Sequence, residues 1–104
     1  MGNDEKSDPW PREDEVIISH PIGLHARPAI AFTKLAKTFP KADIHIRGGD
    51  DGPWIDAKSI VKVMGLKLRH GALLSIRARG DEAEDAMTTL KGLVQRDFNE
   101  PVDR

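Results

Sequence analysis

The sequence predicts an α+β domain in which an antiparallel sheet carries its helices on one face. Its segments follow the order strand, helix, strand, strand, helix, strand, helix. The strand segments alternate apolar and polar residues, which is typical of a sheet with one solvent-facing side. Each helix segment has a single apolar stripe, and one sheet face can bury such stripes. The 104 residues have room for one domain of this kind and no second one.

Residues 1–13 are predicted to form a disordered acidic leader, because they are polar, charged and interrupted by prolines. Trp10 is the one aromatic side chain there, which is too little apolar surface to order the segment. The folded domain is predicted to cover residues 14–96, followed by a C-terminal tail at residues 97–104. Its first strand is the β-branched run from Val16 to Ile18.

The first helix is predicted to lie between two prolines. Pro28 fits the first turn, where no backbone hydrogen bond is lost, and Pro40 marks the end. Apolar residues recur at helical spacing along one side, and polar residues occupy the other. The apolar side is Ala29, Phe32, Leu35, Ala36 and Phe39, and the polar side is Thr33, Lys34, Lys37 and Thr38.

The middle of the chain predicts a β-hairpin. Ile44 and Ile46 alternate with polar residues, and the glycine-rich stretch 48–53 supplies a turn. Ile55 and Ala57 follow it and are expected to point inward.

A short helix, a strand and a longer helix complete the predicted domain. Ser59 is expected to cap the short helix, which runs through Leu66. Asp81 and Glu84 have the spacing of a capping box at the start of the last helix. The apolar faces are Leu74, Ile76 and Ala78 in the strand over 73–79, and Ala83, Ala86, Met87, Leu90 and Val94 in the helix.

His25 is the candidate nucleophile of the chain. It lies where a loop meets a helix start, so free backbone N–H groups and the helix dipole favour an anion beside it. A neutral imidazole can attack phosphorus near neutral pH, and Arg27 offers a guanidinium group for phosphate oxygens. Taken alone, such a histidine is more often a surface or capping residue.

Two motifs stand out in the sequence, Gly-Leu-His-Ala-Arg-Pro-Ala at residues 23–29, and Lys58-Ser59-Ile60 followed by Val63, Met64 and Gly71. In these motifs the chain resembles the HPr family, the histidine-containing phosphocarrier proteins of the bacterial phosphoenolpyruvate-dependent phosphotransferase system. The resemblance extends over roughly residues 14–96 and includes the order of the elements. It implies an open-faced β-sandwich of βαββαβα topology, with strand order 1-4-2-3 and three helices on one face.

The resemblance also implies roles for individual residues. His25 is expected to be phosphorylated at Nδ1 and Arg27 to steady the phosphoryl group, with Ala26 and Pro28 forming the helix start that stabilises it. Ser59 matches a serine that a dedicated kinase, the HPr kinase/phosphorylase, phosphorylates in some bacteria. A phosphate at a helix N-terminus is compatible with the capping role of that serine.

The short helix has more apolar residues than one helix can bury. Some are therefore expected to face solvent and form a docking patch, although core packing is the simpler interpretation for each one singly. Where the family usually has a small residue and a glycine, this chain has Lys62 and Lys67, which add positive charge beside the patch. The candidate docking residues are Ile60, Val61, Met64 and Leu66.

Composition excludes several classes of site. There is no cysteine for disulfides or thiolate metal sites, and His20, His45 and His70 lack metal-ligand spacing. No metal or cofactor is therefore expected. Residues 16–96 hold thirteen bases and eight acids, so a negatively charged partner is expected. Nucleic acid is the weaker option, since there is no Lys/Arg run and no tyrosine.

The family resemblance implies that enzyme I is the phosphoryl donor and that enzyme IIA proteins or domains are acceptors. The protein is then a monomeric, cytoplasmic carrier intermediate rather than a stand-alone enzyme, with no membrane insertion. Two alternatives stay open. One is a phosphocarrier of a nitrogen-related or dihydroxyacetone-kinase branch, and the other is a regulatory binding protein that carries no phosphate. Retention of both His25 and Arg27 argues against the second alternative.

Overall fold

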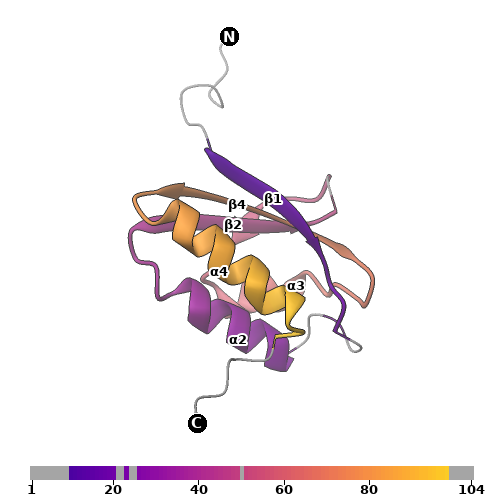
Figure 1. The fold of residues 1–104 in the computed structure, drawn as a ribbon. Coiled ribbons are helices and arrows are strands. Elements are labelled where there is room, and N and C mark those ends of the chain that lie inside the picture. The colour runs from indigo at the N-terminus through magenta and orange to yellow at the C-terminus, as the bar shows by residue number, and fades with distance from the viewer. Residues whose placement is uncertain (1–9, 21–22, 24–25, 50, 99–104) are drawn as a thin grey trace.

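The fold of the computed structural model, which describes residues 10–20, 23, 26–49 and 51–98, is an α+β open-faced sandwich. Over these residues a four-stranded sheet has the order β1-β4-β2-β3, and all neighbouring strands are antiparallel. Three helices cover the same face of the sheet (Figure 1). The predicted fold class and strand order are therefore confirmed. The elements are β1 (Arg12–Ile17), α2 (Ala26–Ala36), β2 (Ala42–Gly48), β3 (Ile55–Asp56), α3 (Ile60–Gly65), β4 (Leu73–Gly80) and α4 (Ala83–Gln95).

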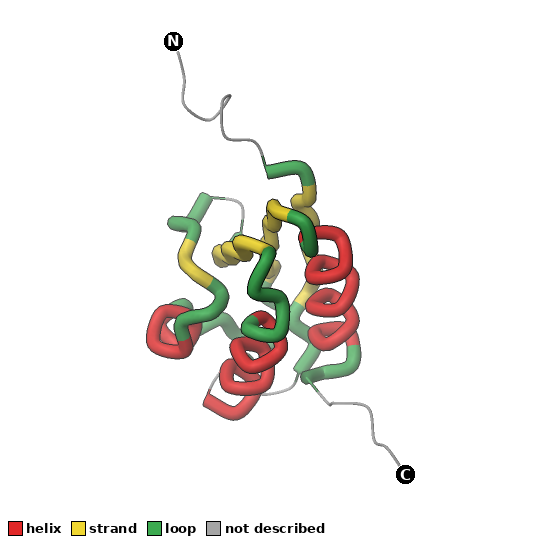
Figure 2. The backbone as a smooth tube through the Cα atoms, turned by 90° about the vertical axis from the view of Figure 1, so that its left-hand side faces the viewer, coloured by secondary structure: helices red, strands yellow, loops and turns green. Residues whose placement is uncertain are grey.

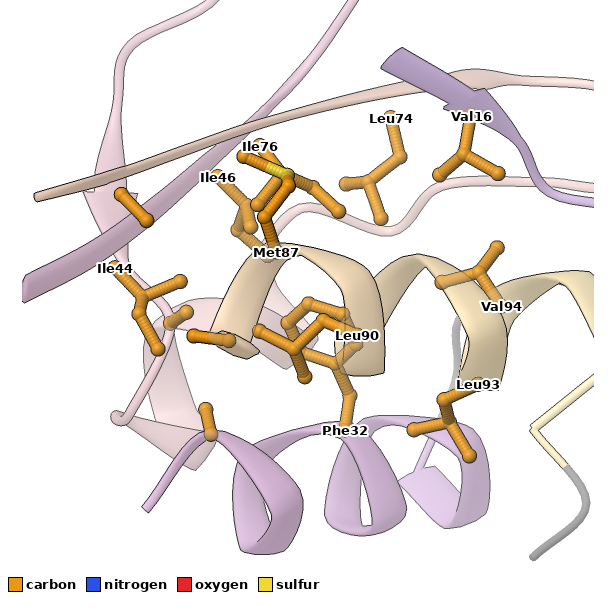
Figure 3. Close-up of a cluster of buried hydrophobic side chains, with 14 of the residues drawn as sticks. Val16, Phe32, Ile44, Ile46, Leu74, Ile76, Met87, Leu90, Leu93 and Val94 are labelled. Carbon is orange, nitrogen blue, oxygen red and sulfur yellow. The ribbon is translucent and has the colours of Figure 1, made fainter. Parts of the chain in front are cut away.

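The core lies between the sheet and the helices. Figure 3 shows Phe32 of α2 and Leu90 of α4 meeting there, with Ile46 and Ile76 of the sheet above them. All four side chains are fully buried. Burying a side chain of this size is worth roughly 1.5–3 kcal/mol, so the apolar stripes that predicted the helices also hold them to the sheet.

One side chain on the predicted polar side of α2 is buried. Thr33 is only 3% exposed, although the helical pattern placed it toward solvent. The reason is that α3 packs against α2, and Thr33 lies in their junction close to Ile30 and Ile60. Figure 2 shows the two helices side by side. A pattern within one helix does not reveal which of its sides a second helix will cover.

The first strand begins at Arg12, earlier than the predicted run from Val16, and so includes residues assigned to the leader. Its register pairs Arg12 with Ala78 and Ile17 with Leu73. Because β-pairing uses backbone groups, the charged residues of this edge strand do not prevent it. Ion pairs to α4 add support, from Arg12 to Glu84 at 3.3 Å and from Asp14 to Lys91.

The predicted capping box at the start of α4 is wrong. The N-cap residue is Glu82, and its side chain makes no capping hydrogen bond. Its carboxylate instead accepts a hydrogen bond from the backbone N–H of Lys41 at 2.7 Å, and Glu84 is engaged by Arg12. The predicted apolar stripe of the helix is buried as expected. The fold also extends beyond the predicted boundary at residue 96, since Phe98 is buried.

The open face of the sheet carries stacked aromatic and guanidinium groups. Trp10 lies 4.6 Å from the ring of His45, measured between centroids. The Arg77 guanidinium lies 4.1 Å from the Trp10 ring and 4.4 Å from the Trp54 ring. Arg79 stacks on Trp10 and Arg47 on Trp54 in the same way. The stack holds Trp10, a residue assigned to the leader, against the sheet.

Candidate functional site

The segment between β1 and α2 contains the candidate nucleophile, and the structure describes the residues before and after it. His25 itself, with Leu24, lies outside the described residues. Before it, Ile18 exchanges two backbone hydrogen bonds with the segment leading into β4, donating to Ala72 at 2.9 Å and accepting from Gly71 at 2.7 Å. The Gly23 N–H then donates to the carbonyl of His20 at 3.0 Å, which closes a turn.

Two features of the structure require glycine at position 23, its backbone conformation and the close approach of a neighbouring segment. Its φ is +88°, a region that other residues rarely adopt. A Cβ on it would lie 2.6 Å from the carbonyl oxygen of Leu68 and 2.9 Å from the Cα of Arg69. The backbone of the segment after α3 therefore lies directly against the loop, and only a glycine permits this approach.

Helix α2 begins at Ala26, as the motif predicts. Ala26 and Arg27 are exposed, and Pro28 is buried in the first turn. No acidic residue lies in that turn. The exposed N-terminal turn can therefore present its partial positive charge and the Arg27 guanidinium to an anion.

Ser59 is confirmed as the N-cap of α3. Its extended backbone, with φ of −106°, precedes the helix, and its hydroxyl accepts a hydrogen bond from the Lys62 N–H at 3.3 Å. The preceding residue of the same motif also has a structural role. The Lys58 ammonium donates to the carbonyls of Phe39 and Ala42 at 2.8 and 2.7 Å, which ties the start of α3 to the loop after α2.

The four candidate docking residues of α3 separate into two pairs. Val61 is 77% exposed and Met64 is 40% exposed. Ile60 and Leu66 are half-buried and pack against the core. The expectation that some of these side chains face solvent is met by the first pair, and core packing accounts for much of the second.

Sequence reasoning missed Ile30 of α2, which is 50% exposed. The available signal was an isoleucine one position off the apolar stripe of the helix. With Thr33 and Ile60 it lines a shallow pocket of about 190 Å³ between α2 and α3, with Lys34 and Lys37 as the other lining residues. The pocket combines apolar walls with two ammonium groups, which suits an apolar side chain from an acidic partner surface.

Positive charge is concentrated on the side of the molecule formed by α2 and α3. Residues 26–42 and 57–72, which contain these helices, include no aspartate or glutamate. Because no acidic side chain of these segments offsets their positive charge, this face favours encounter with an acidic surface. The basic residues in the two segments are Arg27, Lys34, Lys37, Lys41, Lys58, Lys62, Lys67 and Arg69.

Of the other histidines, His20 lies in the turn before His25, and His45 and His70 belong to other segments. His45 is half-buried on the open sheet face, where its Nδ1 lies 3.1 Å from Arg77. Loss of hydration lowers the pKa of His45 from its ordinary 6.5, and the positive charge of Arg77 lowers it further. His70 is exposed. Within the described part of the chain, no cluster of three or more potential ligands is placed to hold a metal ion. None of the described helices is long and apolar enough to cross a membrane.

Comparison with known proteins identifies the family of the chain. The family model described as "PTS HPr component phosphorylation site" matches residues 12–96. The phosphocarrier protein HPr of Xylella fastidiosa is 35% identical over 88 residues, which cover 85% of this chain and 96% of that protein. A multiphosphoryl transfer protein of Xanthomonas campestris is 36% identical over 77% of this chain, although the match covers only 9% of its own length.

Solved structures agree with the sequence comparison. The HPr-C-His crystal structure from Thermoanaerobacter tengcongensis has a TM-score of 0.77 and 33% identity to this chain. The superposition covers 88% of this chain and 99% of that one. The fold, the matched residues and the extent of both comparisons agree, and this chain belongs to the HPr family of phosphocarrier proteins of the phosphotransferase system.

Proposed function

We propose that this protein accepts a phosphoryl group on His25 from phosphorylated enzyme I and passes it to enzyme IIA proteins or domains in phosphoenolpyruvate-dependent sugar phosphotransfer. The observation that supports this most strongly is the family match over residues 12–96, which contains the segment Gly-Leu-His-Ala-Arg-Pro-Ala at residues 23–29. The protein is then an intermediate carrier, because each phosphoryl group that it accepts is passed on.

The chemical step is a displacement at phosphorus. The lone pair on Nδ1 of neutral His25 forms the N–P bond, while the bond from phosphorus to the donor breaks and its electron pair leaves with the donor. In the second transfer, a nucleophile of enzyme IIA forms the new bond to phosphorus while the N–P bond breaks, and the electron pair of that bond returns to Nδ1 and regenerates the neutral imidazole. Protonation of His25 removes the lone pair, so acceptance is expected to slow at acidic pH.

The helix start at Ala26 to Pro28 supplies the stabilisation that the phosphoryl group needs. Exposed Arg27 and the free N–H groups of the first turn of α2 favour the negative charge. An exposed site of this kind stabilises phosphohistidine only moderately. That suits a carrier, since tighter binding of the phosphorylated form would slow its transfer to the next protein.

Partners are expected to dock on the face formed by α2 and α3. Val61 and Met64 supply exposed apolar surface there, and the pocket bordered by Ile30 supplies a recess. Phosphorylation of Ser59 would place about two negative charges at the start of α3, the helix that carries Val61 and Met64. We propose that this modification weakens docking of acidic partners.

The test is phosphorylation by purified enzyme I with phosphoenolpyruvate, scored as acid-labile phosphate on the protein. His25→Ala is expected to acquire no label, and His45→Ala, which removes an imidazole from the open face of the sheet, is expected to label like the parent. Equal labelling of the parent and His25→Ala would overturn the proposal. Supplying enzyme I from the sugar, nitrogen-related and dihydroxyacetone-kinase systems in separate reactions identifies the branch.

The same assay tests the role of Ser59. Ser59→Asp and Ser59→Asn both retain a good N-cap residue, and they differ by one negative charge. Slower labelling of the aspartate variant alone is expected. Equal rates for the two variants would contradict an electrostatic effect at this position.

A further inference from the structure

We propose that Asp97, acting through Ser19, is a positioning residue for phosphoryl transfer. The cap that follows α4 would thereby hold the segment that leads from β1 to the phosphoacceptor histidine. This inference depends on the proposed function, since it concerns the geometry of the same reaction. It assigns a role to residues 97–98, which follow the helix and which the sequence analysis assigned to the C-terminal tail.

Two contacts connect the end of α4 to this segment. The Ser19 hydroxyl donates a hydrogen bond to the Asp97 carboxylate at 2.5 Å. The ring of His20 meets the ring of Phe98 edge-on, with centroids 6.0 Å apart. Figure 1 shows the end of α4 beside the end of β1. Ser19 and His20 therefore have fixed partners shortly before the loop that contains His25.

The backbone at the end of α4 is unusual. The N–H of Phe98 donates to the carbonyl of Leu93 at 2.8 Å, and the N–H of Asp97 donates to that of Val94 at 3.0 Å. This is the Schellman pattern, in which the residue at the position of Asp97 takes a left-handed conformation and is usually glycine. Asp97 has φ of +56° and Phe98 has φ of +65°.

The helix cap gives no reason for a carboxylate at this position. Both capping hydrogen bonds are made by backbone groups, which glycine would provide with less conformational cost. Phe98 is only 7% exposed, so burial of its ring holds the turn in place. The contact that needs the side chain of Asp97 is the hydrogen bond from Ser19. An unfavourable residue with a specific contact beside a reactive segment points to a functional constraint.

The contact would fix the direction in which the chain leaves β1. Backbone hydrogen bonds to Gly71 and Ala72 connect Ile18 to the segment before β4. These two bonds do not connect the chain to α4. Ser19 supplies that connection. The turn from His20 to Gly23 then starts from a defined position. Because displacement at phosphorus depends on the alignment of the attacking nitrogen, a small shift of this segment is expected to slow the reaction.

The experiment compares Asp97→Gly with the parent in two measurements. Glycine removes the carboxylate and suits the left-handed backbone, so the melting temperature is expected to equal or exceed that of the parent. The kcat for phosphorylation by enzyme I is nevertheless expected to fall, by roughly three- to tenfold, with a smaller change in KM. A purely structural role predicts that stability and rate change together.

Three further variants complete the test. Asp97→Asn keeps a carbonyl oxygen that can accept from Ser19 and tolerates the left-handed conformation, so it is expected to retain most of the rate. Ser19→Ala is expected to slow the reaction as Asp97→Gly does, and the double variant no further. Gln95→Ala, an exposed change in the same turn, is the matched control and should react like the parent.

A parental rate for Asp97→Gly would overturn the inference, as would additive losses in the double variant. His25→Ala in the same assay separates this failure from failure of the proposed function. If His25→Ala takes up no label while Asp97→Gly reacts normally, the carrier function stands and the positioning role is wrong. If His25→Ala is labelled like the parent, the proposed function itself is wrong.

Discussion

The surroundings of a single residue, His45, determine how its protonation affects stability. The imidazole is half-buried and lies beside both Trp10 and Arg77, with its Nδ1 3.1 Å from the guanidinium. Desolvation and then the Arg77 charge lower its pKa, while Asp56 opposes them more weakly. The folded state therefore favours the neutral ring more than the unfolded chain does.

This difference predicts a pH-dependent stability. In the unfolded chain His45 binds a proton near its ordinary pKa of 6.5, and in the folded protein it does so only at lower pH. Its contribution to stability is thus complete above that value and is lost as the pH falls toward the folded pKa. Urea unfolding measured above pH 6.5 and again at lower pH should show that the free energy of unfolding falls as the pH falls. The fall should be smaller in His45→Gln. His70→Gln is the control, and an equal fall in all three proteins would contradict the prediction.

At the scale of single elements, periodicity within one segment could be read from the sequence. The residues that alternation and helical spacing assign to the buried faces of β2, β4 and α4 are buried, because each side chain's direction follows from its own backbone. Features that depend on a distant segment could not be read. Glu82 turns to the backbone of Lys41 instead of capping its own helix, and α3 covers Thr33.

The end of α3 gives a prediction about a single position. Lys67 has φ of +52°, a left-handed conformation in which glycine is favoured over residues that carry a Cβ. Lys67→Gly is expected to raise the free energy of unfolding by about 0.5–1 kcal/mol, because removing the Cβ relieves the strain. Lys62→Gly, inside α3, is the matched control and should lower it by about 1 kcal/mol. Urea unfolding measures both, and destabilisation by Lys67→Gly would contradict this account.

At the scale of the whole molecule, local sequence and long-range contacts contribute different parts of the site. The motif around His25 and the cap at Ser59 are contiguous in sequence, so they could be recognised directly. The contacts of Ser19 with Asp97 and of His20 with Phe98 join residues separated by most of the domain. No pattern along the chain identifies such pairs. They arise because the residues after α4 return to the end of β1, shortly before the loop that contains His25.

The distribution of charge over the molecule leads to a final prediction. If acidic partners dock on the face formed by α2 and α3, a positive charge on that face raises the rate of association more than a positive charge elsewhere on the protein. Lys37→Gln and Lys91→Gln each remove one positive charge, the first beside the pocket of that face and the second on α4, where Lys91 pairs with Asp14. At low ionic strength, Lys37→Gln is expected to lower kcat/KM for phosphorylation by enzyme I about two- to fivefold, and Lys91→Gln to change it little.

Raising the salt concentration provides the second arm of this test. Screening weakens attraction between exposed charges, so the difference between the Lys37→Gln protein and the parent should shrink toward zero at high salt. Equal losses in the two variants would mean that only the net charge of the protein matters. A loss that persists at high salt would mean that Lys37 contributes through packing in the pocket. Only a salt-sensitive loss confined to Lys37→Gln agrees with electrostatic docking on the face formed by α2 and α3.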